Sequence, residues 1–544
     1  MNSRLAGLAG ATLLFAALTV LVTWPQALVP ASHIANHHDA QFSIWRIGWI
    51  AHALASAPST LFDANIFYPA RTTLAYSDAT MLEGLIGAPL LWARVSPTLV
   101  YNLLLLVGFI GSGVGMFVLA RHLTGQTAPA LVAGAVFVLL PYRIEHFMHL
   151  ELQWAMFVPL TWWALHRLHE APDARRGAMA GLMLALQVLA CVYYGVFLVM
   201  TLVVFVPLLL VPVRRTSWRP LLTSFAAAAL VAAVIVAPFA WPYLTAAREL
   251  GGRGSEEIAR YSATLMSYLS SPEPNRAWGW TADRWGGPEL RLFPGLLALA
   301  LGALGLSARP RKAMVLYLVT LAVAVELSFG LRGSLYQVLF AHVDALQGFR
   351  ATARFAVIAA AALAVLAAFG TARLLAMAPS RAGAGVLTAA LLLAMAGEAW
   401  NRPMRLTPGE PVAPPPVYQV LRDAAPGTVL ELPVPAADRL PGNDPQYQIW
   451  SMWHWRPLVN GYSGYYPRDY LLTLLRMNVF PEEGTIDRLR AHDVRYIVVH
   501  RAFYDQESYT RLMLRMATRP ELKPWGAYRD TLGTADIFEL IAVD

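Results

Sequence analysis

Long runs of apolar residues, separated by short loops that carry arginine, constrain this 544-residue chain most strongly. Hydrophobic residues make up 57% of the chain and charged residues only 14%, whereas a soluble globular chain carries about 25% charged residues. An apolar helix of about 20 residues crosses a bilayer core, and shorter runs cross it with tilt or local thinning. The pattern predicts a mainly α-helical, multi-pass membrane bundle. Its eleven predicted spans are 5–28, 99–121, 127–143, 152–168, 177–191, 193–213, 219–242, 291–307, 312–330, 355–376 and 383–400.

The basic residues next to these runs fall on one side of the predicted topology. They are Arg4, Arg121, Arg167, Arg175, Arg176, Arg214, Arg215, Arg219, Arg309, Arg311, Lys312, Arg373 and Arg381. Cytoplasmic loops are enriched in Lys and Arg, so this side and the N-terminus are predicted to be cytoplasmic. The net charge of +8 therefore indicates orientation, and no nucleic-acid partner is expected.

The N-terminus and the cysteine count argue against a cleaved signal peptide and against cysteine-based sites. The first apolar run follows Arg4 as in a signal peptide, but it is longer than a usual signal-peptide core and further spans follow it. It is predicted to be an uncleaved first span. Cys191 is the only cysteine, which excludes an internal disulfide and a cysteine-rich metal site.

The apolar segment 81–92 could be counted as one more span. That count would place Arg121 outside and invert every later loop, so residues 31–98 are predicted to form one large external loop. Within it, 81–92 would lie in the interface, and 40–57 would form an interfacial amphipathic helix. The other external segments are predicted at 144–151, 243–290 and 331–354.

Residues 401–544 are predicted to form a small extracytoplasmic α/β domain after the transmembrane domain 1–400. A proline-rich linker, 408–416, precedes alternating patterns that predict helices at 417–423 and 485–492 and strands at 428–432, 494–499 and 537–543. The domain has no Gly-rich phosphate loop, Gly-x-Ser-x-Gly elbow or metal-ligand cluster. Catalysis by this domain alone is therefore not expected.

Asp39 is the leading catalytic candidate because it follows the first span at the outer bilayer surface. A carboxylate that deprotonates an acceptor hydroxyl, or ligates a divalent cation, must lie near this surface if the substrate is a lipid-linked phosphate. His38, next to it, and Arg71, in the same polar loop, are candidates for substrate binding. The alternative is that Asp39 only caps the helix that follows, as Asp often does.

A second candidate group lies in the external turn between two spans. Arg143, His146 and His149 crowd this turn together with Glu145 and Glu151. The two histidines, three residues apart, would share a helical face. With Asp39 they could hold a divalent cation such as Mg or Mn, or with Arg143 they could bind a phosphate. An ordinary polar turn is the alternative.

Two further groups lie at external ends of spans. Arg350 and Arg354 stand one helical turn apart, against the positive-inside pattern. Guanidinium binds phosphate at two points, so a lipid phosphate is the expected partner; contact with ordinary phospholipid head groups is the alternative. Glu289 and Arg291 could contact a substrate head group or simply mark the start of a span.

In the C-terminal domain, the segment 453–466 is unusually aromatic and polar. Aromatic rings stack on sugar faces, and polar side chains supply the hydrogen bonds. The candidates for acceptor binding are His454, Arg456, Asn460 and Tyr462. A packed loop of a small domain is the alternative.

Several segments together resemble the GT-C superfamily of integral-membrane glycosyltransferases, and more narrowly the YfhO-like and uncharacterised bacterial GT-C-like membrane proteins. The segments are His38-Asp39 with Trp45 and Trp49, 61–69, Pro141-Tyr142-Arg143, 292–295 and 460–464. The resemblance implies a bacterial plasma-membrane protein that uses polyprenyl-phosphate sugars as donors. It also implies that Asp39 is the acidic residue after the first span. The paired Asp-Glu of some branches is absent at this position.

These features predict a glycosyltransferase that moves a hexose or pentose from a polyprenyl-phosphate donor to an extracytoplasmic glycan, lipid or protein acceptor. Membrane lipids are the other expected partners, and a divalent cation is the only cofactor considered. The alternatives are a transporter or flippase for a lipid-linked glycan and a cell-envelope assembly factor. A transporter would carry charged residues within its spans, whereas most ionisable residues here lie on one face of the membrane.

Overall fold

The structure is a computed structural model that describes residues 2–211, 218–307 and 311–542. These residues form two compact units, each assembled from distant parts of the chain. The first unit holds Met1–Ala35, Tyr101–Ala240 and Gly252–Pro408, and the second holds Asn36–Val100, Trp241–Gly251 and Gly409–Asp544. The division thus differs from the predicted one, because the first large loop belongs with the C-terminal segment and not with the helix bundle.

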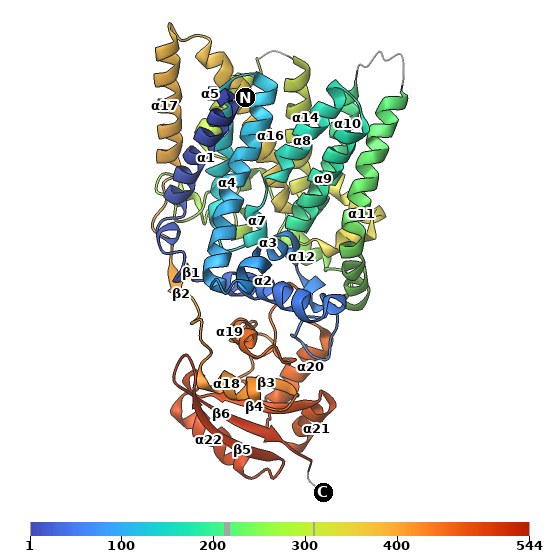
Figure 1. Cartoon of the computed structure of the whole chain (residues 1–544), viewed down its shortest axis with the longest axis vertical. Helices are drawn as coiled ribbons and strands as arrows, with labels where there is room; N and C mark the ends of the chain where they lie inside the picture. Colours follow the sequence, from blue (N-terminus) through green and yellow to red (C-terminus); the bar gives the residue numbers. More distant parts are fainter. Residues whose placement is uncertain (1, 212–217, 308–310, 543–544) are drawn as a thin grey trace. The chain divides into compact units, whose positions relative to one another are not determined.

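The first unit is a helix bundle with a two-stranded sheet (Figure 1). Its helices, two of which (α4 and α11) extend into the second unit, are α1 (Asn2–Val22), α4 (Pro97–Thr124), α5 (Thr127–Val138), α6 (Pro141–Glu145), α7 (Leu150–Gln153), α8 (Phe157–Glu170), α9 (Ala174–Ala190), α10 (Val192–Leu210), α11 (Arg219–Leu250), α12 (Ser255–Arg260), α13 (Leu296–Gly305), α14 (Arg311–Ser328), α15 (Ser334–His342), α16 (Ala356–Leu375) and α17 (Arg381–Glu398). Strands β1 (His33–Ala35) and β2 (Leu406–Pro408) pair antiparallel.

Seven helical segments of the described residues are long and apolar enough to cross a membrane. They are Leu5–Val22, Pro97–Thr124, Thr127–Glu145, Val192–Leu210, Arg219–Leu250, Thr352–Leu375 and Arg381–Glu398. The other four predicted spans correspond to α8, α9, α13 and α14, and their membrane crossing stays a prediction. The predicted fold class, a multi-pass helical membrane protein with a small C-terminal sheet domain, is confirmed.

Helix α16 forms the core of the bundle. It is buried at every position from Ala356 to Thr371 and contacts α5, α13 and α14. A Cβ atom at Gly370 would lie 1.9 Å from the carbonyl oxygen of Leu301 on α13. Small residues at such positions let membrane helices approach closely.

The basic residues used to predict the topology lie at helix ends. Arg121, Arg167 and Arg373 are in the last turns of α4, α8 and α16, whereas Arg219 and Arg381 begin α11 and α17. Arg214, Arg215 and Arg309 lie outside the described residues. The arrangement agrees with the predicted charge pattern, and the assignment of this side to the cytoplasm stays a prediction.

The second unit contains a four-stranded sheet in the order β3-β4-β6-β5. Strand β3 is parallel to β4, and the other pairs are antiparallel. The elements are α2 (His38–Ser56), α3 (Met81–Trp92), α18 (Pro416–Asp423), β3 (Thr428–Leu432), α19 (Asp444–Trp450), α20 (Arg468–Met477), α21 (Glu483–Ala491), β4 (Val494–His500), α22 (Gln506–Ala517), β5 (Leu522–Arg529) and β6 (Thr534–Leu540). The five predicted elements are all present, whereas α19, α20, α22 and β5 were not predicted.

Helix α2 differs from the prediction of an interfacial amphipathic helix over residues 40–57. All residues from Phe42 to Ala51 are buried, whereas an amphipathic interfacial helix keeps one polar face exposed. Inside the second unit α2 packs against α3 and α19. The amphipathic character was therefore predicted wrongly, because tryptophans at the membrane surface and tryptophans in a protein core give the same sequence pattern.

Candidate functional site

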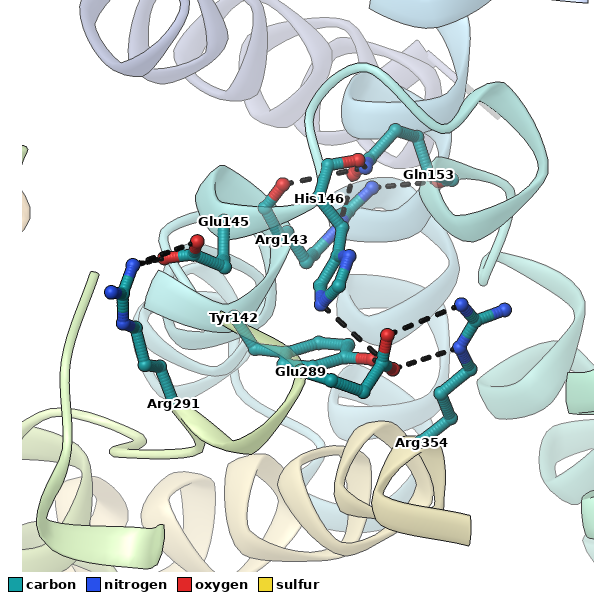
Figure 2. Close-up of polar contacts among 8 residues, drawn as sticks. All are labelled: Tyr142, Arg143, Glu145, His146, Gln153, Glu289, Arg291 and Arg354. Atoms are coloured by element: carbon teal, nitrogen blue, oxygen red, sulfur yellow. Dashed lines mark hydrogen bonds and ion pairs between the residues drawn. The ribbon is translucent and has the colours of Figure 1, made fainter. Parts of the chain in front are cut away.

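Glu289 is the centre of a polar cluster in the first unit. Its Oε1 accepts a hydrogen bond from the Tyr142 hydroxyl at 2.9 Å, and Arg354 donates from Nε to Oε1 at 2.9 Å and from Nη2 to Oε2 at 3.3 Å. His146 Nε2 lies 3.9 Å from the same carboxylate. Figure 2 shows the three side chains converging on Glu289. The side chains of Glu289 and Arg354 are only 14% and 10% exposed, so the pair is shielded from water.

The local sequence explains how this cluster is assembled. Pro141 begins the short helix α6, a position at which proline's missing N–H costs nothing. The helix ends after Glu145, and the turn that follows carries His146 and His149. Burial alone would raise the pKa of the Glu289 carboxyl, but Arg354 and the two histidines lower it to about 2. Glu289 is therefore an anion at neutral pH.

A second ion pair lies beside the first. Arg291 Nη1 contacts Glu145 Oε1 at 2.9 Å, and Arg291 Nη2 contacts Asp283 Oδ1 at 3.0 Å. The side chains of Arg291 and Glu145 are 11% and 10% exposed. Arg291 therefore joins the loop before α13 to α6, and its charge is balanced within the protein.

Arg143 is buried and satisfies backbone oxygens. Its Nη2 donates to the carbonyls of Gly108 and Gln153, and its Nη1 donates to that of Phe137. Only 1% of the residue is exposed. Arg143 thus joins α4, α5 and α7 through hydrogen bonds to their backbone. Its predicted contact with phosphate stays a prediction.

His146 and His149 lie together, as predicted, with ring centroids 5.2 Å apart. They do not share a helical face, since α6 has ended and α7 has not begun. No group of three or more His, Cys, Asp or Glu side chains among the described residues could hold a metal ion. Glu289, whose Oε1 lies 3.9 Å from His146 Nε2, is already bonded to Tyr142 and Arg354. Metal binding by Asp39, His146 and His149 stays a prediction.

Arg350 and Arg354 have different surroundings. Arg350 Nη1 lies 3.3 Å from Glu257 Oε1, and the Arg350 side chain is 36% exposed. Its guanidinium also lies 5.3 Å from the centre of the Tyr261 ring. Of the two arginines, Arg350 is the more accessible to a ligand.

Asp39 lies in the second unit, in the first turn of α2. The helix cap is His37, whose Nδ1 accepts from the Asp39 amide at 3.2 Å. The Asp39 carboxylate itself receives the Tyr462 hydroxyl at 2.8 Å on Oδ1, and its Oδ2 lies 3.2 Å from His37 Nδ1. The alternative in which Asp39 serves as the cap is therefore wrong.

The remaining predicted residues of the second unit fall into two groups. His38 is exposed, and its ring centroid lies 6.3 Å from that of Tyr462; Arg71 is exposed as well. His454 and Arg456 instead stabilise the domain. Burial lowers the pKa of His454 to about 3, and its Nδ1 accepts from the Arg456 amide. The Arg456 guanidinium donates to the carbonyls of Leu421, Ala424 and Ala425.

Sequence reasoning missed three residues that form a buried charged triad in the C-terminal domain. His500 Nε2 lies 2.5 Å from Glu431 Oε2, and His500 Nδ1 lies 2.8 Å from Asp530 Oδ2. His500 and Glu431 are completely buried. A histidine that ends the apolar strand 494–500 is the only sequence signal, and nothing in the sequence shows its partners.

The fold of the chain is similar to that of solved glycosyltransferase structures. The fold matches that of the arabinofuranosyltransferase AftD from Mycobacteria with a TM-score of 0.62 and 15% identity, over 99% of this chain and 40% of that chain. ArnT from Cupriavidus metallidurans is similar with a TM-score of 0.47 and 12% identity, over 98% of each chain, in a structure with bound undecaprenyl phosphate. The fold of the chain is thus similar to that of a known glycosyltransferase, in agreement with the GT-C-like fold that the sequence resemblance implied.

The family follows from the sequence itself. Residues 12–397 match the family described as a domain of unknown function, DUF6311, and the chain belongs to that family. No curated protein matches the sequence. The chain spans 40% of the length of the arabinofuranosyltransferase whose fold it shares.

Proposed function

We propose that the protein is a membrane glycosyltransferase that moves a sugar from a polyprenyl-phosphate donor to an acceptor hydroxyl outside the cytoplasm. The observation that carries the proposal is the position of Asp39. This carboxylate follows the first apolar helix in the sequence, lies in the first turn of α2 and is not used as a helix cap. The fold shared with an arabinofuranosyltransferase supports the same reaction class.

In the proposed reaction Asp39 acts as the general base. It takes the proton of the acceptor hydroxyl while the acceptor oxygen attacks the anomeric carbon of the sugar. The bond between that carbon and the phosphate oxygen breaks, and polyprenyl phosphate leaves with the electron pair. The configuration at the anomeric carbon is inverted because the oxygen attacks opposite the leaving group. No metal ion is assigned to a step.

The leaving phosphate needs positive charge to stabilise it. Of the two arginines of the first unit predicted to bind a lipid phosphate, Arg350 is the better candidate. Arg350 is partly exposed and makes one contact of 3.3 Å with Glu257, whereas Arg354 is bound at two points by Glu289. Arg354 then organises the polar cluster of the first unit.

The proposal is tested with purified protein in liposomes. The donors are a polyprenyl-phosphate hexose and a polyprenyl-phosphate pentose, each radiolabelled in the sugar, with a bacterial envelope extract as the acceptor. Release of polyprenyl phosphate and transfer of label are measured together. Asp39→Asn should abolish both, and the exposed Asp438→Asn should change neither. Undiminished transfer by Asp39→Asn would contradict the role of Asp39 as the general base. Movement of intact donor across the bilayer without bond cleavage would favour the transporter alternative.

A further inference from the structure

The C-terminal domain contributes a side chain to Asp39. The hydroxyl of Tyr462 donates to Asp39 Oδ1 at 2.8 Å, although the two residues are 423 positions apart in the chain. Both belong to the second unit. Two titratable neighbours of this carboxylate are His37, whose Nδ1 lies 3.2 Å from Oδ2, and the adjacent His38. Unlike these two histidines, Tyr462 comes from outside the segment of Asp39.

The backbone that carries Tyr462 is fixed by buried hydrogen bonds. Asn460 is fully buried, and its side-chain oxygen accepts from the Glu431 amide at 2.8 Å. Its side-chain nitrogen donates to the Glu431 carbonyl at 3.0 Å and to Asp444 Oδ1 at 3.1 Å. The Tyr462 amide donates to Gln448 Oε1 at 2.7 Å. Strand β3 and helix α19 therefore hold the loop 460–462 in one place.

Helix α2 is fixed against the same domain. The Phe42 ring meets the Tyr462 ring edge to face at 5.3 Å, and the His52 ring stacks on Trp455 at 4.6 Å. Asn65, in the loop after α2, donates to the Ser451 hydroxyl and to the Arg456 carbonyl. Both ends of the hydrogen bond between Tyr462 and Asp39 are thus held by packed elements of one unit.

A donor held in this way has a defined effect on a carboxylate. It selects one orientation of the carboxylate and stabilises its charged form relative to the protonated form. A general base needs a fixed orientation towards the proton that it takes. Tyr462 holds the carboxylate at Oδ1, and Oδ2 lies 3.2 Å from His37 Nδ1.

We propose that Tyr462 is the positioning residue for the Asp39 carboxylate, so that the C-terminal domain completes the catalytic site of the membrane enzyme. This inference rests on the proposed function. It assigns Tyr462 a role different from acceptor binding.

The test compares Tyr462→Phe, which removes only the hydroxyl, with Tyr528→Phe on β5 of the same domain. The first measurement is the pH dependence of sugar transfer by the full chain in liposomes. For Tyr462→Phe, kcat should fall about tenfold with KM unchanged, and the acid limb of the profile should move to higher pH by about one pH unit. Tyr528→Phe should match the wild type in every respect.

The second measurement does not depend on transfer activity. Carbodiimide labels protonated carboxyl groups, and mass spectrometry of the peptide that contains Asp39 gives the pH midpoint of its labelling. The midpoint should move to higher pH in Tyr462→Phe alone. An unmoved midpoint overturns the inference, even if transfer is slower. A moved midpoint in a protein that transfers no sugar supports the contact but rejects the proposed glycosyltransferase function.

Discussion

Glu289 and Arg354 are joined at two points within the helix bundle, Nε to Oε1 at 2.9 Å and Nη2 to Oε2 at 3.3 Å. The two residues come from the loop before α13 and from the turn that begins α16. A two-point pair between guanidinium and carboxylate fixes direction as well as distance. The pair therefore connects the N-terminal end of the core helix α16 to Tyr142 and His146, at and just after α6.

Glu289→Gln should destabilise the bundle strongly. Removing one partner of a buried ion pair leaves the other charge unpaired, at a cost of about 3–5 kcal/mol. Thermal unfolding in detergent should show the loss, and Glu170→Gln, at a carboxylate 55% exposed, should cost under about 1 kcal/mol. Equal melting temperatures for the two variants would contradict the structural role of the pair.

The same pair should resist acid. The pKa of Glu289 is lowered from 4.5 to about 2. A lowered folded-state pKa contributes stability above the unfolded value, and this stability is lost as pH falls through the folded value. The contribution should thus persist at pH 5 and disappear between about pH 4.5 and pH 2. Melting temperatures of the wild type and Glu289→Gln should converge in that window, and a constant difference down to pH 2 would reject the assignment.

Tyr142→Phe should act through Glu289. The variant removes one hydrogen bond of 2.9 Å to a buried carboxylate, worth about 1.5–3 kcal/mol. Because the two residues share this bond, their effects on the free energy of unfolding should not add. A double-mutant cycle with Glu289→Gln measures the coupling, and strict additivity would show that the contact is absent.

Many helices and strands could be predicted from the sequence, whereas the side-chain contacts between distant segments could not. The strand at 494–499 and the spans were visible because apolar periodicity and helix ends are local properties. The partners Tyr462 of Asp39, Glu289 of Arg354 and Glu431 of His500 were not visible, since each pair joins distant segments. Arg350 and Arg354 also look alike in sequence, and only their surroundings distinguish the partly exposed Arg350 from Arg354, which is 10% exposed.

The triad of His500 should make the C-terminal domain less stable at high pH. Burial would lower the pKa of His500, but Glu431 and Asp530 raise it to about 9 from 6.5. A raised pKa contributes stability that is complete below the unfolded value and lost as pH rises through the folded value. The expected loss between pH 6.5 and pH 9 is about 3 kcal/mol.

Hydrogen exchange of β4 in the full chain, corrected for the intrinsic rate at each pH, measures this loss. His500→Gln should weaken protection at pH 7 and remove most of its decline towards pH 10. His342→Gln, at an exposed histidine of α15, serves as the control. If protection of β4 declined as much in His500→Gln as in the wild type, another group and not His500 would cause the loss of stability.

The close contact of α13 and α16 gives a prediction for the bundle core. A Cβ atom at Gly370 would meet the Leu301 carbonyl at 1.9 Å, and one at Gly305 would meet the Leu366 carbonyl at 2.1 Å. Backbone atoms cannot turn aside as side chains do, so Gly370→Ala must separate the helices. Overpacking of this kind costs about 1–3 kcal/mol or more.

Gly385→Ala on α17 serves as the control, because it adds the same methyl group where no atom lies within 4 Å. Thermal unfolding in detergent should therefore show a lower melting temperature for Gly370→Ala, whereas Gly385→Ala should match or exceed the wild type because alanine favours the helix. Equal stability of the two variants would mean that α13 and α16 are not in backbone contact at Gly370.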